Sequence, residues 1–87
     1  MILAWTAQGW EDYESWALGK RADKRVLRRI HELVREIRRD PEGGLGKPEM
    51  LKGPLAGYAS RRITDEHRLV YRVDGDRIVV VQCRGHY

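Results

Sequence analysis

The stretch HRLVYRVDGDRIVVVQCR, residues 67–84, decides the fold of this chain. Two runs rich in β-branched and aromatic residues, 67–74 and 76–84, flank the turn dipeptide Asp74-Gly75. Such runs are typical of strands, and Asp-Gly between two of them is a strong signal for a tight hairpin turn. The stretch therefore predicts an antiparallel β-hairpin.

Two more strand segments lie upstream of this hairpin. YASRRIT, residues 58–64, leads into it through a turn at Asp65 and Glu66, and MILAWT, residues 1–6, is short and apolar. A Gly- and Pro-rich connection, EGGLGKPEMLKGPLAG, occupies residues 42–57. Loops longer than about 12 residues are uncommon in compact domains and are often functional, so this connection is a candidate for part of a site.

Two helices are predicted between the first strand and the long loop. Residues 7–18 place aromatic side chains at helical spacing, and Thr6 can cap the start of that helix. The second helix has Asp23 as its cap and ends before Pro41, because proline disfavours helix at the preceding residue. Its apolar residues form one continuous stripe, which consists of Val26, Ile30, Leu33, Val34 and Ile37.

The order of elements is therefore β-α-α-β-β-β. This order predicts an α+β fold, with a small antiparallel-rich sheet and both N-terminal helices packed on one face. We expect residues 1–87 to form a single domain with a small core. One cysteine allows no internal disulfide, which fits a reducing cytoplasm. No signal peptide is visible, and no apolar run approaches the roughly 20 residues needed to span a bilayer.

Alternation along the predicted strands separates a helix-covered face from an open one. We expect the covered face to carry Ile63, Leu69, Tyr71, Val73, Val79, Val81 and Cys83. The open face should carry Arg62, Arg68 and Arg84, and His86 joins them if the chain runs on through Gly85. Each arginine alone is typical of a solvated strand, whereas three with an imidazole form a cradle for a phosphodiester.

Cleavage of a phosphodiester by the neighbouring ribose hydroxyl needs a base, an acid and positive charge. The base takes the 2′-hydroxyl proton, the acid protonates the departing 5′-oxygen, and the charge stabilises the oxygens of the pentacoordinate phosphorus. In the long loop, Glu49 lies between Lys47 and Lys52 and could be that base. Such neighbours can equally be ordinary surface charge, so the loop alone leaves both interpretations open.

The chain is basic, with a net charge of +4 and a pI near 9.6. The excess lies mainly in residues 52–87, which have seven Lys and Arg against four Asp and Glu. An acidic partner such as nucleic acid would fit this charge, and so would a plain solvated surface. The same alternatives apply to the basic side of the second helix, which carries Lys24, Arg25, Arg28, Arg29, Arg35, Arg38 and Arg39.

The histidines and the cysteine show no recognised metal-ligand spacing, so we predict no metal site. His31 borders the apolar stripe of the second helix, and His67 is expected to help close the turn before its strand. Cys83 is predicted to be a small core residue rather than a nucleophile. The three tryptophans are expected to make core and helix–sheet contacts.

In combination these motifs resemble the YoeB/Txe-type toxins of the RelE superfamily. The resemblance rests on GKPEMLKGPLAGYASRRITDEHRLVYRV, on the terminal CRGHY, on the pattern W…W.DY..W near the start and on I.ELV..IRRDP before the loop. It covers essentially the whole chain. The sequence departs from the pattern in the extra residues of ALGKRADK between the helices. It also departs at Gly85, which stands in place of a larger residue and suggests a looser tail.

The resemblance implies a RelE-like fold and a toxin of a bacterial type II toxin–antitoxin pair. Such toxins enter the ribosomal A site and cut the mRNA there by metal-free acid–base catalysis without a cofactor, leaving a 2′,3′-cyclic phosphate. Carried over by position, Glu49 would be the general base and His86 the general acid. Arg68 would stabilise the phosphorane, and Tyr87 would help to orient the substrate. The residues expected to hold the RNA are Lys47, Lys52 and Arg62, with Arg84 beside them on the open face.

The partners implied by the resemblance are a Phd/YefM-type antitoxin, the 70S ribosome with its mRNA, and a second copy of the toxin. Operator DNA would be contacted only through the antitoxin complex, and no membrane contact is expected. One alternative on the same fold is a non-catalytic inhibitor of DNA gyrase of the ParE type, and another is a plain RNA-binding module. Glu49 and His86 favour the nuclease, because neither alternative needs an acid and a base.

Overall fold

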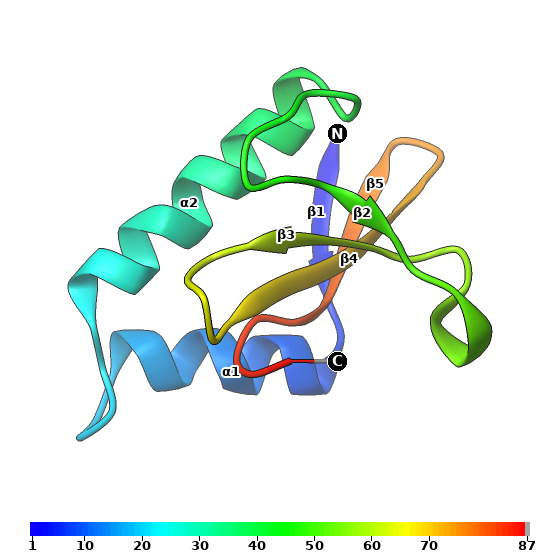
Figure 1. Ribbon diagram of the computed structural model, residues 1–87. Helices are drawn as coiled ribbons and strands as arrows, with labels where there is room; N and C mark the ends of the chain where they lie inside the picture. The colour runs from blue at the N-terminus through cyan, green and yellow to red at the C-terminus, as the bar shows by residue number, and fades with distance from the viewer. Residues whose placement is uncertain (87) are drawn as a thin grey trace.

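The computed structural model describes residues 1–86, and Figure 1 shows its helices and strands. In chain order these are β1 (Ile2–Trp5), α1 (Ala7–Ala17), α2 (Lys24–Arg39), β2 (Glu49–Met50), the 3₁₀ turn η1 (Gly53–Leu55), β3 (Ala59–Arg62), β4 (Arg68–Asp74) and β5 (Arg77–Gln82). Both helices lie on the same side of the sheet. The predicted α+β architecture is therefore confirmed.

The five strands form one mixed sheet in the order β1-β5-β4-β3-β2 (Figure 1). The first strand runs parallel to β5, and the other neighbours are antiparallel. The predicted loop 42–57 supplies an additional strand, because its Glu49 and Met50 pair with Ser60 and Ala59 of β3. A strand of two residues between prolines and glycines has no periodicity of its own, so the sequence pattern did not reveal it.

The predicted helix caps are confirmed. The Thr6 hydroxyl accepts a hydrogen bond from the Gly9 amide, and the Asp23 carboxylate accepts from the amides of Arg25 and Val26. Each cap satisfies amide groups that the first helical turn leaves without a partner. The predicted apolar stripe of α2 is buried and consists of Val26, Ile30, Leu33, Val34 and Ile37.

Gly9 brings α1 into direct contact with the backbone of β5. A Cβ atom at this position would overlap the Val80 carbonyl oxygen, so only glycine allows the helix to approach so closely. The Thr6 amide also donates to that carbonyl, over 3.0 Å. Helix α1 is thereby fixed against the strand that leads into the C-terminal tail.

A β-bulge interrupts the pairing of β4 with β5. Val70 is opposite Gln82, whereas the next residue, Tyr71, is opposite Val80. Val81 is therefore an extra residue in β5. A bulge of this kind shifts the alternation of side chains by one position.

Because of the bulge, the side chains of β5 that precede it face the opposite side of the sheet from the one predicted. Ile78 and Val80 are 0% exposed and belong to the core, and after the bulge Cys83 also belongs to it. Val79 and Val81, which were predicted to be core residues, are only half-buried. Strict alternation backwards from Cys83 gives the wrong two valines, because the count crosses the extra residue.

The core lies between the helices and the sheet, and it includes three residues of the covered face that the sequence predicted: Ile63, Leu69 and Tyr71. Val73 was predicted to join them but is 43% exposed, because the β4–β5 hairpin extends past the helices (Figure 1). In residues 1–86, neither helix combines the length and the apolar character that a membrane crossing needs.

Candidate active site on the open face of the sheet

Strand pairing gathers polar side chains on the face that the helices leave open. Directly opposed residues on neighbouring strands project to the same side of a sheet. Arg62 of β3 is opposite Arg68 of β4, so both side chains lie on one face. The same register forms a second row across four strands, which consists of Glu49, Ser60, Val70 and Gln82. The predicted grouping of Glu49 with the two arginines is thus present.

The start of the long loop runs beside β3. The Arg62 amide donates to the Gly46 carbonyl over 2.7 Å. Gly46 has a φ of +78°, and a Cβ there would lie 2.7 Å from the Leu33 side chain and 3.1 Å from that of Arg61. Lys47 follows with a φ of 52°, which is rare for a side-chain-bearing residue. The loop therefore makes a close, strained turn that brings Lys47 next to Arg62.

Arg61 fixes the loop from inside the molecule. Its side chain is 0% exposed. Nε donates to the Tyr71 hydroxyl over 2.9 Å, Nη1 to the Leu45 carbonyl over 3.0 Å and Nη2 to the Pro41 carbonyl over 3.1 Å. One guanidinium thus joins the core to two points of the chain just before Lys47. Sequence reasoning missed this residue, although its place between Ala59 and Ile63 on the covered face was the available signal.

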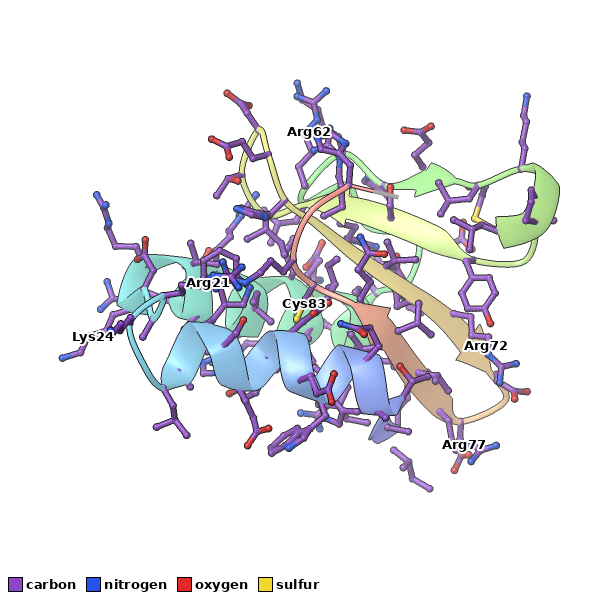
Figure 2. The ribbon with its side chains drawn as sticks, turned by 90° about the horizontal axis from the view of Figure 1, so that it is seen from below. Arg21, Lys24, Arg62, Arg72, Arg77 and Cys83 are labelled. Atoms are coloured by element: carbon purple, nitrogen blue, oxygen red, sulfur yellow. The ribbon has the colours of Figure 1, made fainter. Side chains whose placement is uncertain are left out.

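The first residue of the C-terminal tail is held by α1. The Cys83 amide donates to the Asp12 carboxylate over 3.0 Å, and the Cys83 carbonyl accepts from the Trp16 indole over 2.8 Å. Figure 2 shows Cys83 enclosed between the helix and the sheet. Burial, reinforced by Asp12, raises the pKa of its thiol to about 12. The thiol is therefore protonated at neutral pH, in agreement with the predicted structural role.

Arg84 does not lie with Arg62 and Arg68, which corrects the predicted open-face group. Its guanidinium stacks over the Trp16 ring at 3.4 Å from the centroid. Nε donates to the Ser15 hydroxyl over 2.8 Å, and Nη2 donates to the Arg21 carbonyl in the connection between α1 and α2 over 3.2 Å. Strand β5 ends at Gln82, and the bend that follows turns this side chain toward the helix instead.

Gly85 takes a left-handed conformation with a φ of +83°. Its amide donates to Nδ1 of His67 over 2.8 Å, and its carbonyl accepts from the Arg68 amide over 3.0 Å. Glycine adopts this conformation without a steric penalty. The looser tail suggested by the sequence is therefore not what the structure contains, because both backbone groups of Gly85 have partners.

His86 lies beside the turn that joins β3 to β4. Its carbonyl accepts from the Gln82 side chain over 2.9 Å, and its Nε2 is 3.2 Å from the Asp65 carbonyl. A carbonyl can only accept, so Nε2 carries a proton in this contact. The His86 residue is exposed. Since Gly85 pairs with Arg68, His86 follows immediately next to that arginine. Tyr87, the predicted substrate-orienting residue, lies outside the described residues.

The loop and the tail lie on opposite sides of two strands. Backbone hydrogen bonds join Gly46 to Arg62 and Arg68 to Gly85, and the two arginines face each other across β3 and β4. Neighbouring strands are about 4.8 Å apart, so about 14 Å separates the loop backbone from the tail backbone. Figure 2 shows Arg62 on the side of the molecule toward which the tail runs from Cys83. A phosphodiester over the arginines would have Glu49 on one side and His86 on the other.

One predicted RNA contact, Lys52, lies further out. Lys52 is exposed on the outer part of the β2–β3 hairpin, which projects from the rest of the molecule in Figure 1. A groove of about 400 Å³ lies next to Glu49 at the base of this hairpin and is lined by Pro41, Glu42, Pro48, Met50, Ala59, Tyr71 and Arg72, among others. In residues 1–86, no three His, Cys, Asp or Glu side chains are grouped as metal ligands would be.

Solved structures share this fold even at low sequence identity. YafQ from Escherichia coli has a TM-score of 0.77 to this chain at 13% identity, over 97% of this chain and 91% of YafQ. The match to one family is more specific. Residues 5–87 match the model of the YoeB-like toxins of bacterial type II toxin–antitoxin systems, and the chain belongs to this family.

Individual relatives agree with this assignment. Toxin YoeB of Streptomyces coelicolor is 53% identical over the full length of both chains. The structure of a YoeB/ParE toxin from Agrobacterium tumefaciens has a TM-score of 0.92 at 55% identity, again over both full chains. YoeB of Staphylococcus aureus in its YoeB–YefM complex has a TM-score of 0.89 at 41% identity, over 100% of this chain and 98% of that one.

Proposed function

We propose that this toxin is an endoribonuclease that cuts mRNA in the ribosomal A site by acid–base catalysis, without a metal ion. The observation that carries the proposal is the open face of the sheet, where Arg62 and Arg68 lie between Glu49 on β2 and His86 on the tail. This arrangement provides a base, an acid and positive charge around one position. Membership of the YoeB-like family supports the same activity.

The reaction assigns one step to each group. The Glu49 carboxylate accepts the proton of the ribose 2′-hydroxyl, and the 2′-oxygen forms a bond to phosphorus. Arg68, assisted by Arg62, stabilises the negative charge that develops on the phosphorane oxygens. The bond from phosphorus to the 5′-oxygen then breaks, and His86 donates its proton to that oxygen. The products are a 2′,3′-cyclic phosphate and a 5′-hydroxyl, and Tyr87 is proposed to orient the RNA.

Two lysines are proposed to hold the RNA backbone. Lys47 stands beside Arg62 and two residues before Glu49, so it would contact a phosphate next to the scissile one. Lys52 on the projecting hairpin would contact the RNA, or the ribosome around it, further away. Arg84 is not included, because α1 occupies its guanidinium.

We propose three binding partners for this chain: an antitoxin of the YefM type, a second toxin molecule and the ribosome with its mRNA. The Staphylococcus aureus relative occurs in a complex with YefM and as a dimer, at 41% and 42% identity respectively. An acidic, disordered antitoxin segment would suit a chain with a net charge of +4. We propose the cytoplasm as the compartment, since ribosomes and mRNA are found there.

The proposal is tested by mapping the 5′ ends of an mRNA bound to 70S ribosomes after addition of the toxin. Cleavage is expected in the A-site codon, and naked RNA should remain uncut at the same toxin concentration. The variant Glu49→Gln should lose about a hundredfold or more in rate. Glu11→Gln, which changes an exposed carboxylate on α1, is the matched control and should cleave normally.

Two results would contradict this function. Equal cleavage of naked RNA would remove the requirement for the ribosome. Intact mRNA together with gyrase-dependent DNA breaks would instead support the non-catalytic inhibitor of the ParE type.

A further inference from the structure

His67 has an unusual contact that the proposed reaction does not use. It precedes β4, and its ring packs edge-on against Trp16 with the ring centroids 4.8 Å apart. Its Nδ1 is 2.8 Å from the Gly85 amide nitrogen. A backbone amide can only donate, so Nδ1 must be the acceptor. The contact therefore requires a neutral ring with its proton on Nε2.

This contact lies at the residue that precedes His86. Helix α1 holds the tail at Cys83 and Arg84, and Gly85 links that point to His86. Glycine has the largest backbone freedom of any residue, so its conformation must be set by its partners. The partner of its amide is His67, and the partner of its carbonyl is the Arg68 amide.

We propose that His67 is a positioning residue that holds His86 next to Arg68 by accepting the hydrogen bond of the Gly85 amide. The proposal rests on the proposed function, in which His86 is the general acid. A protonated His67 would present an N–H to the Gly85 N–H, and the two donors would repel each other. The tail would then lose the bond that sets the Gly85 conformation.

The surroundings of His67 favour the neutral ring. Burial lowers its pKa below the ordinary value of 6.5, and the charge of Arg84 adds to this effect, with smaller contributions from His86 and Arg21. The carboxylate of Glu66 acts in the opposite direction. The two imidazoles near the site thus have opposite requirements, because His86 must carry a proton to act as an acid and His67 must keep Nδ1 free of one.

Two substitutions test the hydrogen-bond acceptor of His67 separately from the packing of its ring. In His67→Asn, the side-chain oxygen can occupy the position of Nδ1 and accept the same hydrogen bond, but it cannot titrate. In His67→Phe, the ring can still pack against Trp16, but the acceptor is gone. His31→Asn is the control, since His31 is an exposed histidine of α2 that bonds to Tyr13, away from the tail.

The first measurement uses the toxin alone. Deuterium exchange of the Gly85 amide, followed by NMR and expressed as a protection factor, reports this hydrogen bond without RNA. Because the pKa of His67 lies below 6.5, the wild-type protein should keep its protection from about pH 8 down to pH 6.5 and lose it only at lower pH, and His67→Asn should not lose it. At about pH 8, where wild-type His67 is neutral, His67→Phe should lower the protection factor at least about tenfold, and its low protection should not change with pH.

The second measurement is the single-turnover rate of cleavage on ribosomes. His67→Phe should cleave about tenfold more slowly than wild type, because a misplaced acid loses rate without loss of fold. His67→Asn should stay within about threefold of wild type, and His31→Asn should be unchanged.

The outcomes are distinct. Loss of protection and of rate in His67→Phe, with both rescued in His67→Asn, would support the positioning role. Full protection of Gly85 in His67→Phe would overturn it, and so would lost protection with an unchanged rate. A wild-type protein that protects Gly85 as expected but cuts no RNA would overturn the proposed function, and the positioning role with it.

Discussion

The loop that carries Glu49 and the tail that carries His86 are held in place in opposite ways. The loop is fixed from inside, because the single buried side chain of Arg61 binds two of its carbonyls. The tail is fixed from outside, because α1, the residue before β4 and the end of β5 each supply a partner. The backbone of the loop also pairs with β3, but Arg61 is the buried side chain that holds its start, so loss of Arg61 should have a large effect. A segment held by several side chains should instead loosen in steps.

The largest effect is expected from Arg61→Met. The substitution removes three hydrogen bonds and leaves the Tyr71 hydroxyl and two carbonyls without this donor. Together these losses should lower the free energy of unfolding by about 4 kcal/mol, which urea unfolding measures. Arg77→Met, at an exposed arginine of β5, is the control. A loss below about 1 kcal/mol would show that Arg61 is not the main anchor of the loop.

Gly46→Ala tests the shape of the loop and not its anchor. The added Cβ would meet Leu33 and Arg61, and the φ of +78° is unfavourable for alanine. We expect a destabilisation of about 2 kcal/mol by the same unfolding measurement. Gly44→Ala is the matched control, because a Cβ there meets nothing within 4 Å. Equal stability of the two variants would mean that the loop adapts to the methyl group.

Trp16→Phe tests one of the several attachments of the tail. It removes the indole hydrogen bond to the Cys83 carbonyl but keeps an aromatic ring beneath Arg84. We expect a loss of about 1 kcal/mol in the free energy of unfolding. Trp10→Phe, at an exposed tryptophan, should change it less. If Trp16→Phe instead matched Arg61→Met, the tail would also depend on one residue, and the contrast with the loop would disappear.

The smallest effect concerns the pH dependence of stability through Cys83. Its folded-state pKa of about 12 lies above the ordinary value of 9.0, so the unfolded chain loses this proton first. The contribution is fully present below pH 9.0 and is lost as the pH rises from there toward about 12. Between pH 9 and pH 10 the difference amounts to about 1 kcal/mol. Cys83→Ala should show a flatter decline over that interval, and identical slopes would contradict a buried thiol.

Local rules were enough to predict the helices and most of the sheet. Thr6 and Asp23 cap helices because their side chains satisfy amides close to them in sequence. The predicted hairpin also forms for local reasons, although its two turn residues are Gly75 and Asp76, because Asp74 still pairs with Arg77 as the last residue of β4. The open-face pairing of Arg62 with Arg68 also followed from alternation over short distances. These features depend on neighbours within a few residues, which a sequence displays directly.

The features that the sequence did not predict depend on distant contacts. The bulge at Val81 changes which valines are buried, and the end of β5 at Gln82 lets Arg84 turn toward α1; no local pattern marks either feature. The burial of Arg61 depends on carbonyls in a loop far from it in sequence. Arg61 is a polar residue in the core and Val81 is an extra residue in a strand. In both cases tertiary contacts, rather than local propensity, determine where the residue lies.

The strand order has a consequence for biosynthesis. Because β5 lies between β1 and β4, the opening strand of the nascent chain has no sheet neighbour until some 75 residues later, the separation of the bonded pair Thr6 and Val81. Contacts so remote in sequence form late, since closing the intervening chain costs entropy. The sheet can thus be completed only after β5 has been synthesised, so the proposed catalytic face cannot form while β1 to β4 alone have left the ribosome.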